Sequence, residues 1–114
     1  MSKENDFVPL TEAFYYILVT LYAGPLHGYG IMQEVEKISS GKTIIGAGTL
    51  YTALNTLAKR KYIENVNPSS ADSRRKVYSI TAPGRAALLA EINRLEELLE
   101  NGRQAIHRQR GDSQ

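Results

Sequence analysis

The feature of this sequence that most constrains its fold is an apolar stripe near the end of the chain. Its positions follow one another at steps of 4, 3, 4, 3 and 4 residues, which is the 3.5-residue repeat of a coiled coil. A chain of 114 residues buries one modest core, which leaves the helix over residues 82–107 without a partner. We therefore expect this helix to pack against a second copy; the alternative is that it folds back on the chain's own first helix. The stripe consists of Leu88, Ile92, Leu95, Leu99, Gly102 and Ile106.

Apolar spacing predicts three shorter helices before this long one. The first begins after Thr11, a suitable N-cap, and ends at Gly24 and Pro25, which do not continue a helix. Helical periodicity also indicates helices over residues 29–38 and 49–60. The expected fold class is therefore mainly helical.

The remaining pattern is that of short strands. Residues 43–45 are β-branched and could form one short strand, whereas residues 62–67 and 76–81 predict the two strands of a hairpin. Three helices followed by a small β-hairpin is the chain order of a winged helix-turn-helix. We expect a flexible arm over residues 1–9, a winged helix-turn-helix domain over 10–81, a dimerisation helix over 82–107 and a disordered tail over 108–114.

Charge is distributed unevenly along the chain. Residues 42–76 hold seven cations and two acids, a local charge of +5, although the whole chain carries only +2. The remaining residues therefore carry −3. A basic segment within a mildly acidic chain is a local electrostatic footprint of the kind that meets nucleic acid.

The predicted helix over residues 49–60 has two distinct faces. Leucines and one alanine gather on one side, which must face the core, and small polar residues with one lysine lie opposite. Asparagine can bond adenine bidentately, threonine offers a hydroxyl and a methyl group, and glycine lets the backbone approach a phosphate. An ordinary solvated face has the same composition, so neighbouring features must decide. The core side is Leu50, Leu54, Leu57 and Ala58, and the residues expected on or beside the DNA-reading side are Gly48, Thr49, Tyr51, Thr52, Asn55 and Lys59.

Three consecutive cations, Arg74, Arg75 and Lys76, follow the polar turn of the hairpin. A wing that lies against a phosphate backbone or in a minor groove requires such a cluster, although a basic edge strand also discourages aggregation. After a polar helix in this order, contact with double-stranded DNA is the better interpretation, and Lys42 in the same basic segment joins the expected contacts. Two such domains on a two-fold axis would read half-sites about 34 Å apart. The alternative is a winged-helix interaction module, whose basic patch and heptad helix bind other proteins.

Other classes of function find little support in the sequence. The chain has no cysteine, so disulfides and thiolate chemistry are excluded, which fits a cytoplasmic protein. His27 and His107 lie in different elements without accompanying ligands, so we expect no metal site, no cofactor and no enzyme. The longest apolar run, residues 13–23, has 11 residues and is too short to cross a membrane.

Three spaced motifs add a family resemblance. The first is His27-Gly28-Tyr29-Gly30-Ile31, the second is Gly48-Thr49-Leu50-Tyr51 with Leu54, Leu57 and Ile63, and the third is Arg74-Arg75-Lys76-Val77-Tyr78 followed by Ile80-Thr81 and Gly84. Together they resemble the signature of the PadR family of bacterial transcriptional regulators over roughly residues 10–106, in its compact branch with one C-terminal dimerisation helix. Thr52 stands where that family usually has proline, and Lys61 where it usually has glycine. We interpret Lys61 as added charge at a turn.

The resemblance implies a homodimeric repressor in which the first and last helices of both chains pack together. Phe14 then joins the dimerisation residues Leu88, Ile92, Leu95, Leu99 and Ile106. The resemblance also implies release from DNA by a small aromatic or amphipathic effector. Its pocket could be lined by residues that more often form a plain dimer core, namely Phe14, Tyr15, Tyr16, Leu95 and Leu99.

Overall fold

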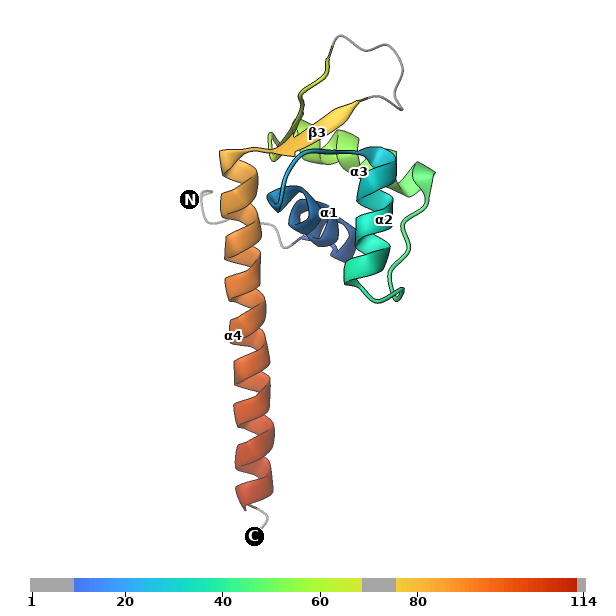
Figure 1. The fold of residues 1–114 in the computed structure, drawn as a ribbon. Helices are drawn as coiled ribbons and strands as arrows, with labels where there is room; N and C mark the ends of the chain where they lie inside the picture. The colour runs from blue at the N-terminus through green and yellow to red at the C-terminus, as the bar shows by residue number, and fades with distance from the viewer. Residues whose placement is uncertain (1–9, 69–75, 113–114) are drawn as a thin grey trace.

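The computed structural model describes residues 10–68 and 76–112, which form a winged body and a long helix that leaves it (Figure 1). Residues 1–9, predicted as a flexible arm, lie outside the described part. The expected class, a mainly helical winged helix-turn-helix with a long last helix, is confirmed. In chain order the described elements are α1 (Glu12–Tyr22), β1 (Leu26–His27), α2 (Gly28–Ile38), α3 (Ala47–Lys59), β2 (Ile63–Asn65), β3 (Val77–Ile80) and α4 (Ala82–Asp112).

The three strands form one antiparallel sheet in the order β1-β3-β2. Leu26 lies opposite Tyr78 and Ile63 lies opposite Ile80, so β3 is the central strand. Tyr78 and Ile80 are buried, whereas the alternate residues of β3 are half-buried. The sheet therefore packs one face against the same core that the helices enclose.

The prediction of a short strand over residues 43–45 is wrong, because the third strand of the sheet is β1. Leu26 and His27 have no strand-like pattern of their own, but they lie beside the edge of β3 and pair with it. Residues 43–45 pair with no strand of the described chain and belong to a loop, in which Ile45 is buried and Ile44 is 70 % exposed. The availability of a hydrogen-bonding neighbour therefore prevailed over β-branched propensity.

The core joins one face of each of the first three helices to the sheet. The leucines expected on the inner side of α3 are buried, but Ala58 is exposed. Ala58 lies at the edge of the buried stripe, whose centre is shifted toward Ala53. The largest fully buried apolar side chains are Ile17, Leu18, Leu21, Ile31, Val35, Leu50, Leu54, Leu57 and Ile63.

Two predicted helix starts are confirmed. Thr11 Oγ1 and Thr81 Oγ1 each accept a hydrogen bond from a main-chain N–H three residues later, at 3.1 Å. The Thr81 hydroxyl also donates to the Lys61 carbonyl at 2.6 Å, which ties the start of α4 to the turn after α3. Gly84 packs so closely on this turn that a Cβ would overlap the carbonyl oxygen of Tyr62.

Lys61 has a structural role beyond the charge that the sequence suggested. Its φ is +67°, in the left-handed region. Lys61 N–H donates to the Ala58 carbonyl and Tyr62 N–H donates to the Leu57 carbonyl, both at 3.0 Å, which is the Schellman ending of a helix. Glycine is favoured at this position because it has no Cβ to oppose the conformation. The lysine therefore occupies a backbone conformation that costs about 1 kcal/mol for a residue with a side chain.

α4 has 31 residues and is about 46 Å long at 1.5 Å per residue. Its first turns lie beside the body and the remainder extends away from it (Figure 1). The helix continues to Asp112, so residues 108–112, predicted as part of a disordered tail, are helical. The prediction ended the helix where its apolar residues end. Loss of an apolar face removes a packing surface, but the main-chain hydrogen bonds of the helix can continue without it.

The apolar stripe of α4 has different surroundings along its length. Leu88 is 3 % exposed and belongs to the chain's own core, and Ile92 packs half-buried against that core. The prediction that Leu88 serves dimerisation is therefore wrong, because elements of the same chain cover it. Leu95, Leu99 and Ile106 remain 39, 55 and 60 % exposed, respectively. Folding back on the chain's own body thus describes only the first half of α4.

Candidate nucleic-acid interface

α3 presents the polar surface that its sequence predicts. Its three leucines are at most 1 % exposed, so the opposite side of the helix faces solvent. α3 also lies beside the hairpin of β2 and β3 (Figure 1). The predicted DNA-reading residues exposed on it are Gly48, Thr49, Thr52, Asn55 and Lys59.

The first turn of α3 has no side-chain cap. Gly46 stands at the N-cap position, and the turn contains no acidic residue. The positive end of the helix dipole is therefore uncompensated there, and an anion such as a phosphate is favoured. Lys42 is exposed in the loop that leads to this turn.

The loop between α2 and α3 is held by side-chain hydrogen bonds. The buried Ser39 hydroxyl accepts from Thr43 N at 2.9 Å. The Thr43 hydroxyl donates to Glu12 Oε2 at 2.6 Å, and Glu12 is the first residue of α1. These bonds fix the start of α3 relative to both α1 and α2.

Tyr51 is half-buried on α3. A Cβ added to Gly28 would lie 2.5 Å from Tyr51 Oη, so the glycine leaves room that the tyrosine fills. Burial raises the pKa of Tyr78, and the nearby Tyr51 raises it further. Tyr51 therefore lies among α2, α3 and β3, whereas the sequence placed it among the DNA contacts.

Of the three cations predicted on the hairpin, one lies within the described residues. Lys76 is half-buried directly before β3. Arg74 and Arg75 lie outside the described residues, so their contact with DNA stays a prediction. Asn65 Oδ1 accepts from Asn67 N at 2.8 Å, an Asx turn that ends β2.

Phe14 and Thr52 line one hollow between α1 and α3, with a volume of about 300 Å³. The Arg60 guanidinium lies over the Phe14 ring, with its carbon 5.4 Å from the ring centroid. Phe14 therefore faces α3 of its own chain, and the structure does not place it in a common pocket with Leu95. The hollow is lined by Thr11, Ala13, Phe14, Thr49, Thr52, Ala53 and Thr56.

A second hollow, between α1 and α4, contains three of the five residues predicted for an effector pocket. Its volume is about 320 Å³. The rings of Tyr15 and Tyr16 meet edge to face, with centroids 5.6 Å apart. Phe14 and Leu99 are not part of its lining. The lining consists of Leu10, Glu12, Tyr15, Tyr16, Glu91, Arg94 and Leu95.

Glu91, which is absent from the predicted sites, is the buried charge of this hollow. It is 2 % exposed, and Arg94 donates to its two carboxylate oxygens from Nε at 2.9 Å and from Nη2 at 2.7 Å. These hydrogen bonds lower the pKa of Glu91 against the opposing effect of burial, and the main-chain N–H of Leu10 lowers it further. Glu91 therefore stays ionised and joins α4 to the start of α1. The sequence signal that could have indicated this buried charge is the position of an acid between Leu88 and Ile92 of the apolar stripe.

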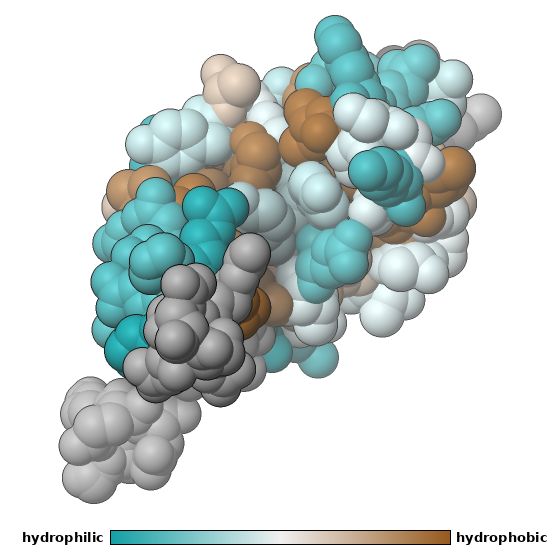
Figure 2. Space-filling view, turned by 90° about the horizontal axis from the view of Figure 1, so that it is seen from below, coloured by the Kyte–Doolittle hydropathy of each residue, from teal (hydrophilic) through white to brown (hydrophobic). Residues whose placement is uncertain are grey.

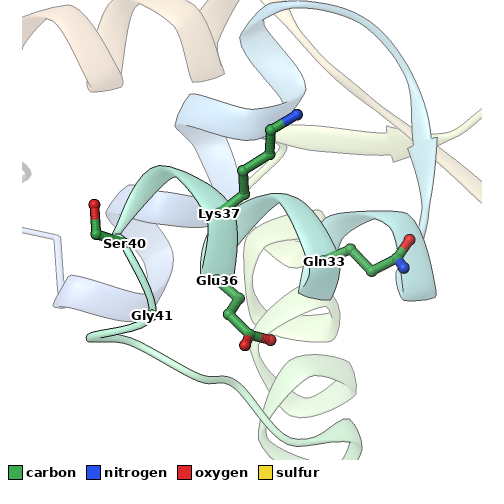
Figure 3. A pocket seen from close by; sticks show the side chains of 5 residues that line it. All are labelled: Gln33, Glu36, Lys37, Ser40 and Gly41. Carbon is green, nitrogen blue, oxygen red and sulfur yellow. The ribbon is translucent and has the colours of Figure 1, made fainter.

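Another hollow, at the end of α2, has a volume of about 440 Å³ but no converging groups. Figure 3 shows that Glu36 and Lys37 point in opposite directions. Exposed polar side chains that diverge offer no common position for a ligand. The lining residues are Gln33, Glu36, Lys37, Ser40 and Gly41.

The described residues contain no cluster of side chains able to hold a metal ion. His27 occupies the N-cap position of α2 but makes no capping hydrogen bond with its side chain, and His107 is exposed on α4. Within the same part of the chain, no helix combines the length and apolar character needed to span a bilayer. Seen from below, apolar residues form separate brown patches among hydrophilic ones (Figure 2).

A family model and one curated relative match this chain. The model of the transcriptional regulator PadR-like family matches residues 17–90, which include α2, α3 and the whole sheet. An uncharacterized 37.1 kDa protein of a Streptomyces fradiae transposon is 33% identical over 82 residues, which are 72% of this chain and 22% of that protein. The chain thus spans about a fifth of that relative's length.

Solved structures share the fold. A transcriptional regulator from Clostridium thermocellum matches with a TM-score of 0.70 and 25% identity, over 80% of this chain and 89% of that one. A PadR family transcription regulator from Clostridium difficile matches with a TM-score of 0.69 and 22% identity, over 84% of this chain and 99% of that one. Because the family model covers well over half of the chain and carries the winged body described above, the chain belongs to the PadR-like family of transcriptional regulators.

Proposed function

We propose that this chain is a homodimeric repressor that binds a two-fold symmetric operator, with α3 in the major groove and the hairpin on the flanking backbone. The observation that carries the proposal is the division of α3, whose leucines are buried and whose polar residues are exposed beside the hairpin. A helix with a small polar face approaches base edges more closely than one lined with long side chains.

The exposed residues of this surface have different tasks in the proposed complex. Asn55 can bond one adenine through two hydrogen bonds, and the methyl group of Thr52 can contact thymine. Lys59 and Lys42 flank the patch and neutralise phosphates, which fixes the register without reading the sequence. The uncapped first turn of α3 offers its N–H groups to a further phosphate. Because Thr52 replaces the proline usual in the family, the operator sequence of a relative does not transfer.

The second half of α4 supplies the surface for a second copy. Leu98, Leu99 and Ile106 are 53, 55 and 60 % exposed on a helix that extends away from its own body. Exposed large apolar side chains that recur along one helix favour association. The dimer would present two α3 helices to half-sites about 34 Å apart, so two weak contacts combine into specific binding.

The hollow between α1 and α4 is the position we propose for an effector. Tyr15, Tyr16 and Leu95 offer aromatic and apolar surface to a small aromatic or amphipathic compound. Glu12 also lines this hollow and holds the loop before α3, which gives a bound compound a route to the reading helix. Compounds that release the parent from DNA should lose potency against Tyr16→Ala, whose DNA binding should persist. Equal release of both proteins would exclude this hollow.

A gel shift with DNA from the chain's own promoter region tests DNA reading. Binding should weaken steeply with salt because phosphate contacts release counterions. Lys59→Ala should lower the slope of log affinity against log salt by about one unit, and combined Arg74→Ala and Arg75→Ala by about two. Asn55→Ala should cost about 1–3 kcal/mol on the specific site only. Lys37→Ala, at the end of α2 away from the hairpin, is the charge control and should leave the slope unchanged.

Sequencing the genomic fragments that the purified protein retains would identify the operator. We expect a two-fold symmetric sequence with half-sites about one helical turn apart. Salt-insensitive binding, or a monomer in solution that retains no fragment, would contradict the proposal. Either result would favour a winged module whose basic patch binds an acidic protein.

A further inference from the structure

We propose that the flank of α3 that faces α1 binds the sugar–phosphate backbone of one operator strand, with Arg60 held over the Phe14 ring to contact a phosphate. This inference rests on the proposed DNA reading by α3 and adds a second surface beside the face that meets the bases. Three observations carry it: an arginine without a counter-ion on Phe14, the hollow beside this ring, and the position of both along the reading helix.

Arg60 stands at the C-cap of α3, and its charge has no carboxylate partner. The residue is exposed, and its side chain forms no ion pair or hydrogen bond with another described residue. It lies instead over Phe14, with the guanidinium carbon 5.4 Å from the ring centroid. A guanidinium on an aromatic ring keeps N–H donors at its edge, in the planar fork that fits a phosphate. Arg60 is therefore held in place and still able to bind an anion.

Phe14 restrains this guanidinium before any DNA is bound. An arginine side chain at a helix end otherwise samples many rotamers, and binding must order it. Phe14 is half-buried and packs against the core, which restrains the ring itself. A restrained ring beneath the guanidinium lowers the cost of ordering when a phosphate binds. Phe14 is in this way a positioning residue, which acts on DNA only through Arg60.

The hollow beside Phe14 gives a DNA strand a place to lie. It separates α1 from α3, has a volume of about 300 Å³ and includes Thr49, Thr52 and Thr56 in its lining. Threonine hydroxyls are frequent donors to the phosphates and sugars of DNA. Among the described residues, no carboxylate lines this hollow. Its surface therefore combines hydroxyl donors with apolar carbon and contains no charge that would repel a phosphate.

Helical spacing places these residues on one flank of the reading face. At 3.6 residues per turn, Thr49, Thr56 and Arg60 fall within roughly 40° of one another around α3. They lie roughly a quarter turn from Asn55 and Lys59, which are exposed on the face proposed to read the bases. The hollow and the arginine thus run alongside the reading face for most of its length.

The dimensions of the major groove make this flank a contact surface. An α-helix with its side chains is about 10–12 Å across, and the groove is about 12 Å wide. A helix that reads bases therefore has a backbone wall close to each flank. The other flank of α3 carries the half-buried Tyr51 and the exposed Ala58, neither of which is charged. Complementary charge therefore favours the flank with Arg60 for a phosphate.

Neutral phosphate analogues test this contact. The probe is the operator recovered from the retained genomic fragments, with one phosphate at a time replaced by a methylphosphonate. We expect at least one position per half-site at which the replacement weakens binding of the parent by about tenfold. Arg60→Ala should be insensitive to that replacement, and its salt slope should be lower by about one unit. Lys37→Ala, the charge control, should respond to every replacement as the parent does.

A double-mutant cycle tests the role of Phe14. Phe14→Leu removes the ring but keeps an apolar side chain, and it should weaken operator binding by about threefold. In a chain that already carries Arg60→Ala, the same change should cause no further loss, because no guanidinium remains to be positioned. Phe14→Tyr keeps the ring and should bind as the parent does. Thermal denaturation verifies that each variant is folded.

Thr56→Val distinguishes a backbone contact from a base contact. Valine keeps the shape of threonine without its hydroxyl, so binding should weaken by about threefold on operator and on unrelated DNA alike. Phosphate contacts carry no sequence information, which is why both duplexes should respond. A loss confined to the operator would place Thr56 on the bases and contradict a backbone site.

Two further results would overturn the inference. One is an Arg60→Ala chain with the salt slope and the methylphosphonate pattern of the parent, which would leave Arg60 only as a cover for Phe14. The other is an equal loss from Phe14→Leu with and without Arg60, which would make the ring purely structural. The parent decides the proposed function separately. A parent that retains its operator keeps that function in either case, whereas a parent that retains no genomic fragment removes both.

Discussion

The two halves of α4 have the same apolar period but opposite surroundings. In the first half, Leu88 is 3 % and Glu91 is 2 % exposed, because the chain's own body covers this face. In the second half, Leu99 is 55 % and Ile106 is 60 % exposed, and no described element of the chain covers them. An apolar repeat thus indicates that a helix needs a partner, without indicating which chain supplies it.

Two glycines show the same contrast. Gly84 is buried at the start of α4, against the carbonyl of Tyr62, whereas Gly102 is exposed with open space around it. The first glycine is required by a contact within the chain. The second meets no such contact, because nothing lies within 4 Å of the position that its Cβ would take.

Truncation of Leu88 should have the largest effect on folding. Leu88→Ala removes a buried side chain and leaves a cavity, so the free energy of unfolding should fall by about 3 kcal/mol. Leu99→Ala should leave this value within about 0.5 kcal/mol and weaken dimerisation instead. Urea denaturation at protein concentrations below the dimerisation midpoint measures the difference. Equal losses of unfolding free energy in the two variants would show that both halves of α4 contribute to the fold of the single chain.

The paired glycine substitutions sharpen the comparison further. Gly84→Ala should destabilise the fold by about 2 kcal/mol, because its Cβ would overlap the backbone carbonyl of Tyr62 and crowd the side chain of Ile80. Gly102→Ala should increase the helicity of α4 without loss of stability, because its Cβ meets open space. Circular dichroism and thermal denaturation distinguish the two outcomes. A stabilised Gly84→Ala variant would show that the contact with Tyr62 yields easily.

Removal of the charge on Glu91 should have a smaller and pH-dependent effect. Glu91→Gln weakens a buried carboxylate–guanidinium pair, so the free energy of unfolding should fall by about 1.5 kcal/mol at neutral pH. Because Arg94 lowers the pKa of Glu91 in the folded state below its ordinary value of 4.5, the stabilisation is complete above that pH. It is lost as the pH falls through the folded-state pKa.

The stability difference between the parent and Glu91→Gln should therefore shrink below pH 4.5. Glu97→Gln, on the exposed second half of α4, is the control and should show no comparable difference. Denaturation at a series of pH values measures both. A gap for Glu91→Gln that stays constant down to acid pH would mean that the pair contributes no charge-dependent stability.

The smallest effect concerns the turn that anchors the first half of α4. Lys61→Gly should raise the free energy of unfolding by about 1 kcal/mol, because glycine adopts a positive φ without opposition from a Cβ. Lys61→Ala removes the charge but keeps the Cβ, so it should give no such gain. Similar thermal midpoints for the glycine and alanine variants would assign the effect to charge.

The sequence predicted correctly those parts of the fold that depend on residues close together in the chain. The two faces of α3 followed from its period, because a helix with buried leucines has only one side left for polar residues. Thr11 and Thr81 cap their helices through their own hydroxyl groups, which is a local interaction. Most of the exposed polar surface of α3 was predictable for the same reason.

The remaining features depend on contacts between distant residues. β1 is two residues long and exists because β3 lies beside it. Leu88 and Leu99 belong to one period, so only the position of the body distinguishes their partners. In the turn after α3, Lys61 adopts a positive φ. Because this position holds lysine and not glycine, the sequence did not indicate that conformation. The buried pair of Glu91 and Arg94 resembles an ordinary surface pair until α1 and Leu10 cover it.

The length of α4 makes it a lever. Contacts at Thr81, Gly84 and Glu91 hold one end, and the helix is about 46 Å long, so a rotation of about 10° at the held end moves the far end by roughly 8 Å. In the proposed dimer the far end joins the second copy. In such a dimer, a small adjustment of packing around Glu91 would produce a large change in the position of the far end. In that proposed dimer, the separation of the two α3 helices would depend on residues at the held end of α4, far from the end that joins the second copy.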